Sequence, residues 1–334
     1  MSEKQIDPPI WDLLVKAIHK GECVPFLGAA ANVGGAGFEI PTGVKLAKDL
    51  VCYMTGLKGK NPEDLVKLEP PLDGHKEMLR SGVTDLARVS LHLMDKVGPK
   101  DFLDQIRSRL INAKSRPSPL LRTLADLPFE LIVTTNYDNM MEVALRERGR
   151  PFYPVVQPMR GFEEKEGLRI NTELQNYDGV RLYKIHGELP PEADGRGVGE
   201  EAAAAAASGE TSPIIITEED YIQFLTVLRE PTRGVPRWIV SKITSGRVLF
   251  LGYGLEDWDF RTLYESLIAP IPRYLKPGSY AIQWQPPAFW VKYWESRGVK
   301  IYDMDIKEFA AQLREKYEEE YGKLPAPEGG GDVV

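Results

Sequence analysis

Two short segments of this chain end in polar side chains that a buried strand does not need. They are Leu131-Ile-Val-Thr-Thr-Asn-Tyr-Asp138 and Tyr183-Lys-Ile-His-Gly187. An apolar or β-branched run of this length is typical of a buried parallel strand. Ligands of open α/β sheets bind at the carboxyl edge of the strands, so we expect Asn136, Asp138 and His186 to lie at one edge. The pattern predicts an α/β fold with a Rossmann-like, mostly parallel sheet and helices on both faces.

Three further segments extend this pattern. Cys23-Val-Pro-Phe-Leu-Gly-Ala-Ala-Ala-Asn32 indicates a strand that runs into small residues, and Arg247-Val-Leu-Phe-Leu-Gly-Tyr-Gly-Leu-Glu-Asp257 a strand with a glycine-containing turn. Thr217-Glu-Glu-Asp-Tyr-Ile-Gln-Phe224 has the residues of a capped helix start. In this order, and over about residues 20 to 305, the segments resemble the sirtuin-like family, in particular its prokaryotic branch associated with anti-phage defence. The resemblance implies NAD⁺ as the bound nucleotide.

The first loop departs from the family pattern. The family usually has Gly-Ala-Gly-Ala-Ser where this chain has Gly28-Ala-Ala-Ala-Asn32. Alanine at position 30 removes a glycine that permits positive φ and a close approach of the backbone to a phosphate. Asn32 retains a side chain that can hydrogen-bond where serine would.

The zinc module of protein-deacylating sirtuins is also missing. Those enzymes have two Cys-x-x-Cys pairs between the His-Gly and the glycine-rich turn, whereas this chain contains only Cys23 and Cys52, both upstream. Two isolated thiols cannot build such a site, and no other spacing indicates a metal. We therefore expect a zinc-less member of the family with no metal.

Charge and hydropathy exclude several classes. The net charge of −7 argues against a sequence-independent nucleic-acid binder, and the basic stretch 96–116 is interpreted as a solvated helix face. Nucleic acid is expected only through a partner. No apolar run approaches the roughly 20 residues of a membrane span. The amino terminus lacks the apolar core of a secretory signal, and two cysteines fit a reducing compartment, so the expected location is the cytoplasm.

One sirtuin-like domain is expected over residues 1–324, with a disordered tail at 325–334. Helices are expected near both ends of this domain, at 11–19 and 305–321, and a helical subdomain at about 55–127 is inserted into the sheet. A mobile loop is expected at about 190–212, where the alanine run is too short to sustain a helix. Strands are predicted at 23–27, 129–134, 181–185, 213–216, 247–251, 279–283 and 299–302.

The polar strand ends predict the chemistry. Cleavage of nicotinamide from NAD⁺ expels a cationic leaving group, so a base that takes a proton from water or from a ribose hydroxyl is more useful than a strong acid. His186 is assigned as this general base, and Asn136 as the group that positions the ribose or the water. Asp138 accepts from the nicotinamide carboxamide or steadies the loop. The alternative for Asn136 and Asp138 is a strand-exit turn with a helix cap.

The family resemblance implies the nucleotide contacts. Gly28 and its neighbours would face the pyrophosphate. The turn that contains Gly252, Gly254 and Asp257 would close over the adenosine half of NAD⁺. Tyr253 in that turn either stacks on the adenine or belongs to the core. The expected NAD⁺-binding set is Gly28, Ala29, Ala30, Asn32, Thr135, Gly187, Gly252, Tyr253, Gly254 and Asp257.

The leading hypothesis is therefore an NAD⁺ glycohydrolase that destroys NAD⁺ as the effector of an abortive-infection defence. A non-catalytic nucleotide-binding scaffold is the alternative favoured by Ala30, and a zinc-independent protein deacylase ranks third. An ordinary oxidoreductase ranks last because no clean Gly-x-Gly-x-x-Gly follows the first strand. The resemblance further implies a homo-oligomer that works with a HerA-type hexameric ATPase, or alternatively with a short Argonaute.

Overall fold

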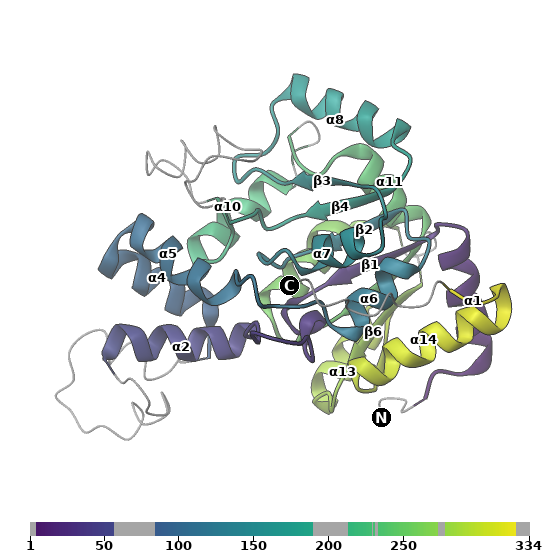
Figure 1. Cartoon of the computed structure of the whole chain (residues 1–334). Helices are drawn as coiled ribbons and strands as arrows, with labels where there is room; N and C mark the ends of the chain where they lie inside the picture. Colours follow the sequence, from purple (N-terminus) through teal and green to yellow (C-terminus); the bar gives the residue numbers. More distant parts are fainter. Residues whose placement is uncertain are drawn as a thin grey trace, which may run out of the picture.

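The centre of the molecule is a parallel sheet. The computed structural model describes residues 5–56, 84–189, 213–228, 230, 233–272 and 278–324. Within these ranges seven strands pair in the order β3-β4-β2-β1-β5-β6-β7, and every pair is parallel (Figure 1). The chain builds outward from β1 in both directions, and such a reversal opens a crevice at the carboxyl edge. The strands are β1 Cys23–Leu27, β2 Leu131–Thr134, β3 Phe152–Val156, β4 Val180–Lys184, β5 Arg247–Leu251, β6 Ser279–Gln283 and β7 Val299–Asp303.

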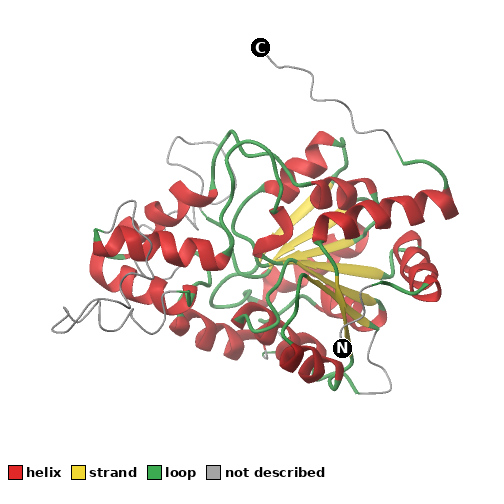
Figure 2. Cartoon of the chain, turned by 90° about the horizontal axis from the view of Figure 1, so that it is seen from below, coloured by secondary structure: helices red, strands yellow, loops and turns green. Residues whose placement is uncertain are grey.

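Helices cover both faces of this sheet, as Figure 2 shows from below. The first begins on the double proline at 8–9, and the last is capped by Asp305, whose carboxylate accepts from the Lys307 amide over 2.8 Å. The helices are α1 Pro8–His19, α2 Gly43–Thr55, α4 Leu86–Val97, α5 Pro99–Leu110, α6 Pro119–Asp126, α7 Met140–Glu147, α8 Glu164–Asn176, α10 Glu218–Leu228, α11 Arg237–Ser245, α12 Trp258–Leu263, α13 Ala288–Glu295 and α14 Ile306–Tyr321, with short turns η1 Ala29–Asn32 and η3 Tyr264–Ile268.

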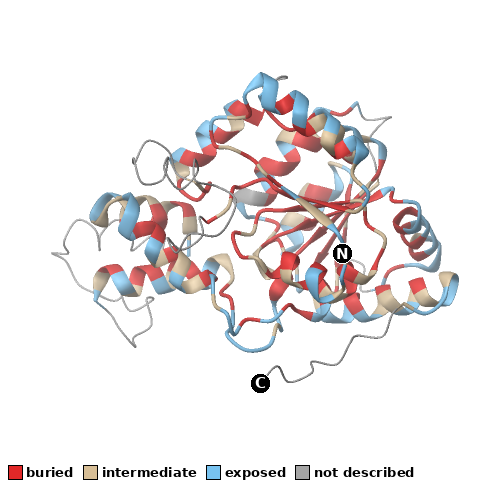
Figure 3. Cartoon of the chain, turned by 45° about the horizontal axis from the view of Figure 1, so that its top comes forward, coloured by how far each residue is buried: buried red, intermediate tan, exposed pale blue. Residues whose placement is uncertain are grey.

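Two hydrophobic cores lie on the two faces of the sheet. Successive strand residues point to opposite faces, so Phe26 packs with Phe250 in one core while Leu27 and Leu251 belong to the other. Helices α1, α6, α7 and α14 cover the Leu27 side, and α8 and α10 to α13 cover the Phe26 side. Figure 3 shows the inner strands buried and the helices exposed on their outer faces, whereas the edge strand β3 is partly exposed. The expected α/β architecture is confirmed.

Three helices between β1 and β2 project away from the sheet. These projecting helices, α2, α4 and α5, pack on one another at the left of Figure 1. The apolar stripe on α4 forms as expected: Val89 and Leu93 are fully buried, and Leu86 and Val97 pack against the same core. Helix α6 differs, because it returns to the sheet and packs on α7 and α14.

One predicted strand was wrong, and one strand was not predicted. Residues 213–216 join the sheet nowhere in the described chain; Ile214 makes one antiparallel bridge to Gly187, and the Ile215 amide donates to the His186 carbonyl. The segment therefore lies over the turn that follows β4. The sequence reading also missed β3, an edge strand interrupted by Pro154, because proline removes a ladder donor and hides the strand pattern. The loop and the tail expected at 190–212 and 325–334 lie outside the described residues.

Candidate functional site

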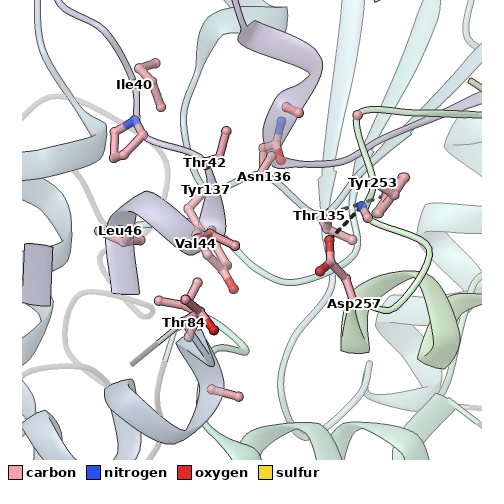
Figure 4. A pocket seen from close by; sticks show the side chains of 18 of the residues that line it. Ile40, Thr42, Val44, Leu46, Thr84, Thr135, Asn136, Tyr137, Tyr253 and Asp257 are labelled. Carbon is pink, nitrogen blue, oxygen red and sulfur yellow. Dashed lines mark hydrogen bonds between the residues drawn. The ribbon is translucent and has the colours of Figure 1, made fainter. Parts of the chain in front are cut away.

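A cavity of about 510 Å³ opens at the carboxyl ends of β1, β2 and β5. Its lining comes from the loops after these strands, from the end of β6, from α10 and from the projecting helices (Figure 4). The cavity therefore lies at the edge of the sheet where the sequence predicted a ligand site. The lining residues are Ala29, Ala30, Ile40, Pro41, Thr42, Gly43, Val44, Leu46, Thr84, Asp85, Leu86, Ala87, Leu110, Thr135, Asn136, Tyr137, Asp138, Tyr221, Gly252, Tyr253, Gly254, Glu256, Asp257 and Gln283.

Asn136 lies in the wall of this cavity, two residues after β2. Its backbone amide donates to Thr134 Oγ1 over 3.0 Å, and its side-chain nitrogen donates to the Gly28 carbonyl over 3.0 Å. The amide nitrogen is thus engaged by the loop after β1. The side-chain oxygen is the atom with which Asn136 can accept from a ligand hydroxyl or a water.

Asp138 lines the cavity and also starts α7. One carboxylate oxygen accepts from the Met140 amide over 2.8 Å, which is the capping role expected as the alternative. The side chain is buried, and desolvation raises the pKa of this carboxyl to about 6, partly offset by the Met140 hydrogen bond and the charge of Lys184. Asp138 therefore sits in the site as a group that titrates near neutral pH.

His186 stands behind the cavity wall rather than in it. The residue is fully buried, and its ring meets Tyr221 and Phe224 edge-on, with centroids 5.5 Å and 5.3 Å away. Burial lowers the pKa of this imidazole to about 3, so the ring is neutral at physiological pH. Tyr221 itself lines the cavity, so this residue contacts both the buried imidazole and the cavity.

The loop after β1 is built by main-chain bonds. The Gly28 amide donates to the Leu251 carbonyl and the Ala30 amide to the Gly252 carbonyl, each over 2.9 Å. Gly28 has no room for a side chain, because a Cβ there would lie 2.6 Å from the Gly252 oxygen. Ala29 and Ala30 face the cavity, as expected, whereas Gly28 lies behind them.

Asn32 holds the loop from behind. It is buried, and its side-chain oxygen accepts from the Ser118 amide over 2.9 Å at the start of α6. It does not line the cavity. Gly187 is likewise outside the lining; it takes φ +83°, and a Cβ there would lie 2.1 Å from the Pro213 carbonyl oxygen.

The turn after β5 closes the other side of the cavity. Gly252 takes φ +78° and presses on the loop after β1, where a Cβ would lie 2.2 Å from the Ala31 nitrogen. The hydroxyl groups of Tyr253 and Thr135 lie 3.3 Å apart, joining this turn to the β2 exit. Asp257 accepts from the Gly254 amide over 2.7 Å, which fixes the turn.

Tyr221 is the residue that sequence reasoning missed. It lies in the first turn of α10, whose expected capped start is present: Asp220 accepts from the Thr217 amide over 2.8 Å, and Thr217 Oγ1 accepts from the Asp220 amide over 3.1 Å. An ion pair of 3.5 Å between Arg88 and Glu218 joins α10 to α4. The capping pattern predicted the helix, but nothing in it predicted the side of the helix that meets His186.

The charged side chains in the described part of the cavity wall are acidic. Among the described residues, the cavity lining includes the carboxylates of Asp85, Asp138, Glu256 and Asp257 and no lysine, arginine or histidine. Such a wall attracts a positively charged group and repels phosphates. Among the described residues, no group of three or more His, Cys, Asp or Glu is arranged to hold a metal ion. None of the helices within the described ranges is long and apolar enough to cross a bilayer.

Comparison with known proteins identifies the family of this chain. Residues 130–302, more than half of the chain, match the family described as the SIR2-like domain. This chain belongs to the SIR2-like family. The matched range runs from β2 to β7 and includes Asn136, Asp138 and His186.

Individual relatives of this SIR2-like chain are distant. The NAD(+) hydrolase ThsA of Enterococcus faecium is 24% identical over 246 residues, which cover 72% of this chain and 39% of ThsA. The chain thus spans about two fifths of that relative. Two solved structures align at 12% and 11% identity, each with a TM-score of 0.46: one titled Structural Basis for the Mechanism and Regulation of Sir2 Enzymes, the other a Sir2 homolog–NAD complex. They cover 95% and 96% of this chain, and it covers 100% and 97% of theirs.

Proposed function

We propose that this SIR2-like protein is an NAD⁺ glycohydrolase, which hydrolyses NAD⁺ to nicotinamide and ADP-ribose. The observation that carries the proposal is that Asn136 and Asp138 meet the loop after β1 and the turn after β5 around one cavity. The relative named an NAD(+) hydrolase supports the same reaction.

The reaction assigns a task to each group. Water attacks the anomeric carbon of the nicotinamide ribose, and the bond electrons pass to the nicotinamide nitrogen, which neutralises its charge. The Asn136 oxygen accepts from a ribose hydroxyl or from this water. His186 takes the water proton, which requires the Tyr221 ring in contact with it to move, because the imidazole is fully buried and does not line the cavity. Asp138 accepts from the carboxamide while it holds the start of α7.

We also propose the biological setting on the strength of the sequence resemblance. The chain acts in the cytoplasm as the effector of an anti-phage defence, in a zinc-less branch that uses no metal. It assembles as a homo-oligomer with a HerA-type hexameric ATPase, or alternatively with a short Argonaute, and meets nucleic acid only through that partner. Co-expression with each candidate followed by light scattering tests this arrangement, and a monomer that binds neither would contradict it.

The catalytic assignment is tested by single-turnover release of nicotinamide from NAD⁺, with and without the candidate partners. His186→Ala and Asn136→Ala are expected to slow release by about a hundredfold to ten-thousandfold, the usual contribution of general-base catalysis and orientation. Asn176→Ala is the matched control, because this exposed asparagine on α8 bonds only its own helix. The assignment is wrong if His186→Ala keeps more than about half of the wild-type rate.

A non-catalytic nucleotide-binding subunit is the second candidate. It is favoured by the Ala30 amide, which is already engaged by the Gly252 carbonyl over 2.9 Å. Titration with fluorescent etheno-NAD⁺ separates the two functions. Saturable binding with no release of nicotinamide, under every assembly condition tested, would support the scaffold and reject the hydrolase.

A further inference from the structure

A lysine is buried at the end of β4, beneath the candidate site. The Lys184 side chain is 1% exposed, and its ammonium lies 2.7 Å from Glu142 Oε1 on α7 and 3.1 Å from Glu188 Oε1. It also donates to the main-chain oxygen of Asp138 over 3.2 Å. Desolvation lowers the pKa of Lys184, but Glu142 and then Glu188 outweigh it, so the net pKa is raised and the lysine stays charged.

A gain in stability does not by itself explain why a charged lysine is buried at this position. Removing an ammonium and a carboxylate from water is costly, and well-packed apolar side chains of similar volume often serve the fold equally well. The Glu142 side chain is 6% exposed, so most of this cost applies to both partners. The position of the lysine in the chain offers a better explanation.

Lys184 connects the two segments that carry the candidate catalytic residues. Through the Asp138 carbonyl and Glu142 it holds the loop that carries Asn136 and starts α7. Its own main-chain oxygen accepts from the Gly187 amide over 3.3 Å, so the same residue shapes the turn that carries His186. Lys184 does not line the cavity, and it can act on a substrate only through these two segments.

We propose that Lys184 is a positioning residue that fixes the Asn136–Asp138 loop relative to the His186 turn for cleavage of NAD⁺. This inference rests on the proposed hydrolase function. It assigns to Lys184 no proton transfer and no contact with substrate. Its loss should therefore lower turnover and leave substrate affinity nearly unchanged, because misplacing reacting groups by about 1 Å can cost a hundredfold.

The test compares the full-length protein with Lys184→Met/Glu142→Leu, which replaces the buried pair with apolar side chains. Nicotinamide release is measured in single turnover, and etheno-NAD⁺ titration gives both the dissociation constant and the number of intact sites. We expect release per intact site to fall by at least about tenfold, with the dissociation constant changed less than about threefold. Glu142→Gln, which keeps an acceptor for Lys184, should retain most of the activity.

The matched control is a second buried ion pair, Arg148–Asp126, whose charged atoms lie 2.7 Å apart. It joins the end of α7 to α6, Asp126 also pairs with Arg314 of α14, and neither Arg148 nor Asp126 lines the cavity. Asp126→Asn/Arg148→Met should lower stability and leave release per intact site unchanged. Lys184→Arg, which keeps charge and donors, covers the case in which the apolar double variant fails to fold, and it should recover activity relative to Lys184→Met. Release per intact site equal to wild type in both the double variant and Lys184→Met would overturn the inference. An inactive wild type would instead reject the hydrolase.

Discussion

The side-chain nitrogen of Asn136 donates to the main-chain oxygen of Gly28 over 3.0 Å, which joins the exits of β2 and β1. The bond explains why an amide suits this position better than a carboxylate. An amide can satisfy the Gly28 carbonyl with its nitrogen and still offer an oxygen to a ligand. A carboxylate offers only acceptors, and it would face the carbonyl oxygen with a negative charge.

Asn136→Asp therefore separates shape from hydrogen-bonding pattern. The substitution keeps the volume but leaves the Gly28 carbonyl without its donor, so we expect a loss of about 1–3 kcal/mol in the free energy of unfolding. Nicotinamide release should fall at least about a hundredfold. Denaturant unfolding and the single-turnover assay measure the two effects. Asn176→Asp on α8 serves as the control, and wild-type activity in Asn136→Asp would contradict the role given to the amide.

Tyr221 is expected to limit access to His186. Tyr221→Ala removes a ring that packs on the imidazole at the cavity wall, so nicotinamide release by the isolated chain should rise severalfold. Tyr221→Phe keeps the ring and should behave like the wild type. Ile222→Ala is the neighbouring control, because this side chain is 70% exposed. A fall in activity for Tyr221→Ala in a well-folded protein would show that the ring assists catalysis instead.

The titration of His186 should show whether removal of the Tyr221 ring exposes the imidazole to water. The pKa of the imidazole is lowered to about 3, so its NMR signals should not move between pH 5 and pH 8 in the wild type. A lowered histidine pKa stabilises the folded chain above the unfolded value of about 6.5, and this stabilisation is lost as the pH falls toward 3. In Tyr221→Ala the His186 imidazole should reach water, and its pKa should rise into the range between pH 5 and pH 8. A wild-type ring that titrates near pH 6.5 would refute the burial.

Asp138 gives a pH dependence of the opposite sign. Because its pKa is raised to about 6, the folded chain binds the proton more tightly than the unfolded chain, and this stabilisation is lost as the pH rises through 6. Asp138→Asn does not titrate and keeps an oxygen for the Met140 amide. At pH 8 it should raise the free energy of unfolding by about 2–3 kcal/mol, and the gain should vanish below about pH 4. Chemical denaturation at both pH values measures it, and an equal difference at both would contradict the assignment.

Sequence patterns predicted the parts of the fold that depend on period and composition. The strands that end at Thr134 and Lys184 were identifiable because apolar runs stop abruptly in polar residues. The edge strand with Pro154 was not, since a partly exposed strand with proline lacks such a run. The run at 213–216 looked like a strand because its isoleucines are buried, but they are buried against a turn and not within the sheet.

The candidate site was predictable by residue type but not by side-chain contact. Asn136 and Asp138 reach the cavity as expected, whereas His186 is buried against Tyr221 and does not line the cavity. Asn32 bonds the start of α6, and spacing along the chain contains no information about that distant partner. The ion pair of Lys184 could not be predicted for the same reason. Its carboxylate partner Glu142 is 42 positions away along the chain and contacts it only after folding.

The bonds between the loop after β1 and the turn after β5 have a consequence for how such proteins are found. The donors at Gly28 and Ala30 and the acceptors at Leu251 and Gly252 are main-chain atoms, which every residue type supplies except for the proline nitrogen. The shape of the loop therefore does not depend on glycine at position 30, and alanine can replace it without altering the frame. A search that requires a glycine fingerprint would overlook this chain, although main-chain bonds shape its loop without a glycine at position 30.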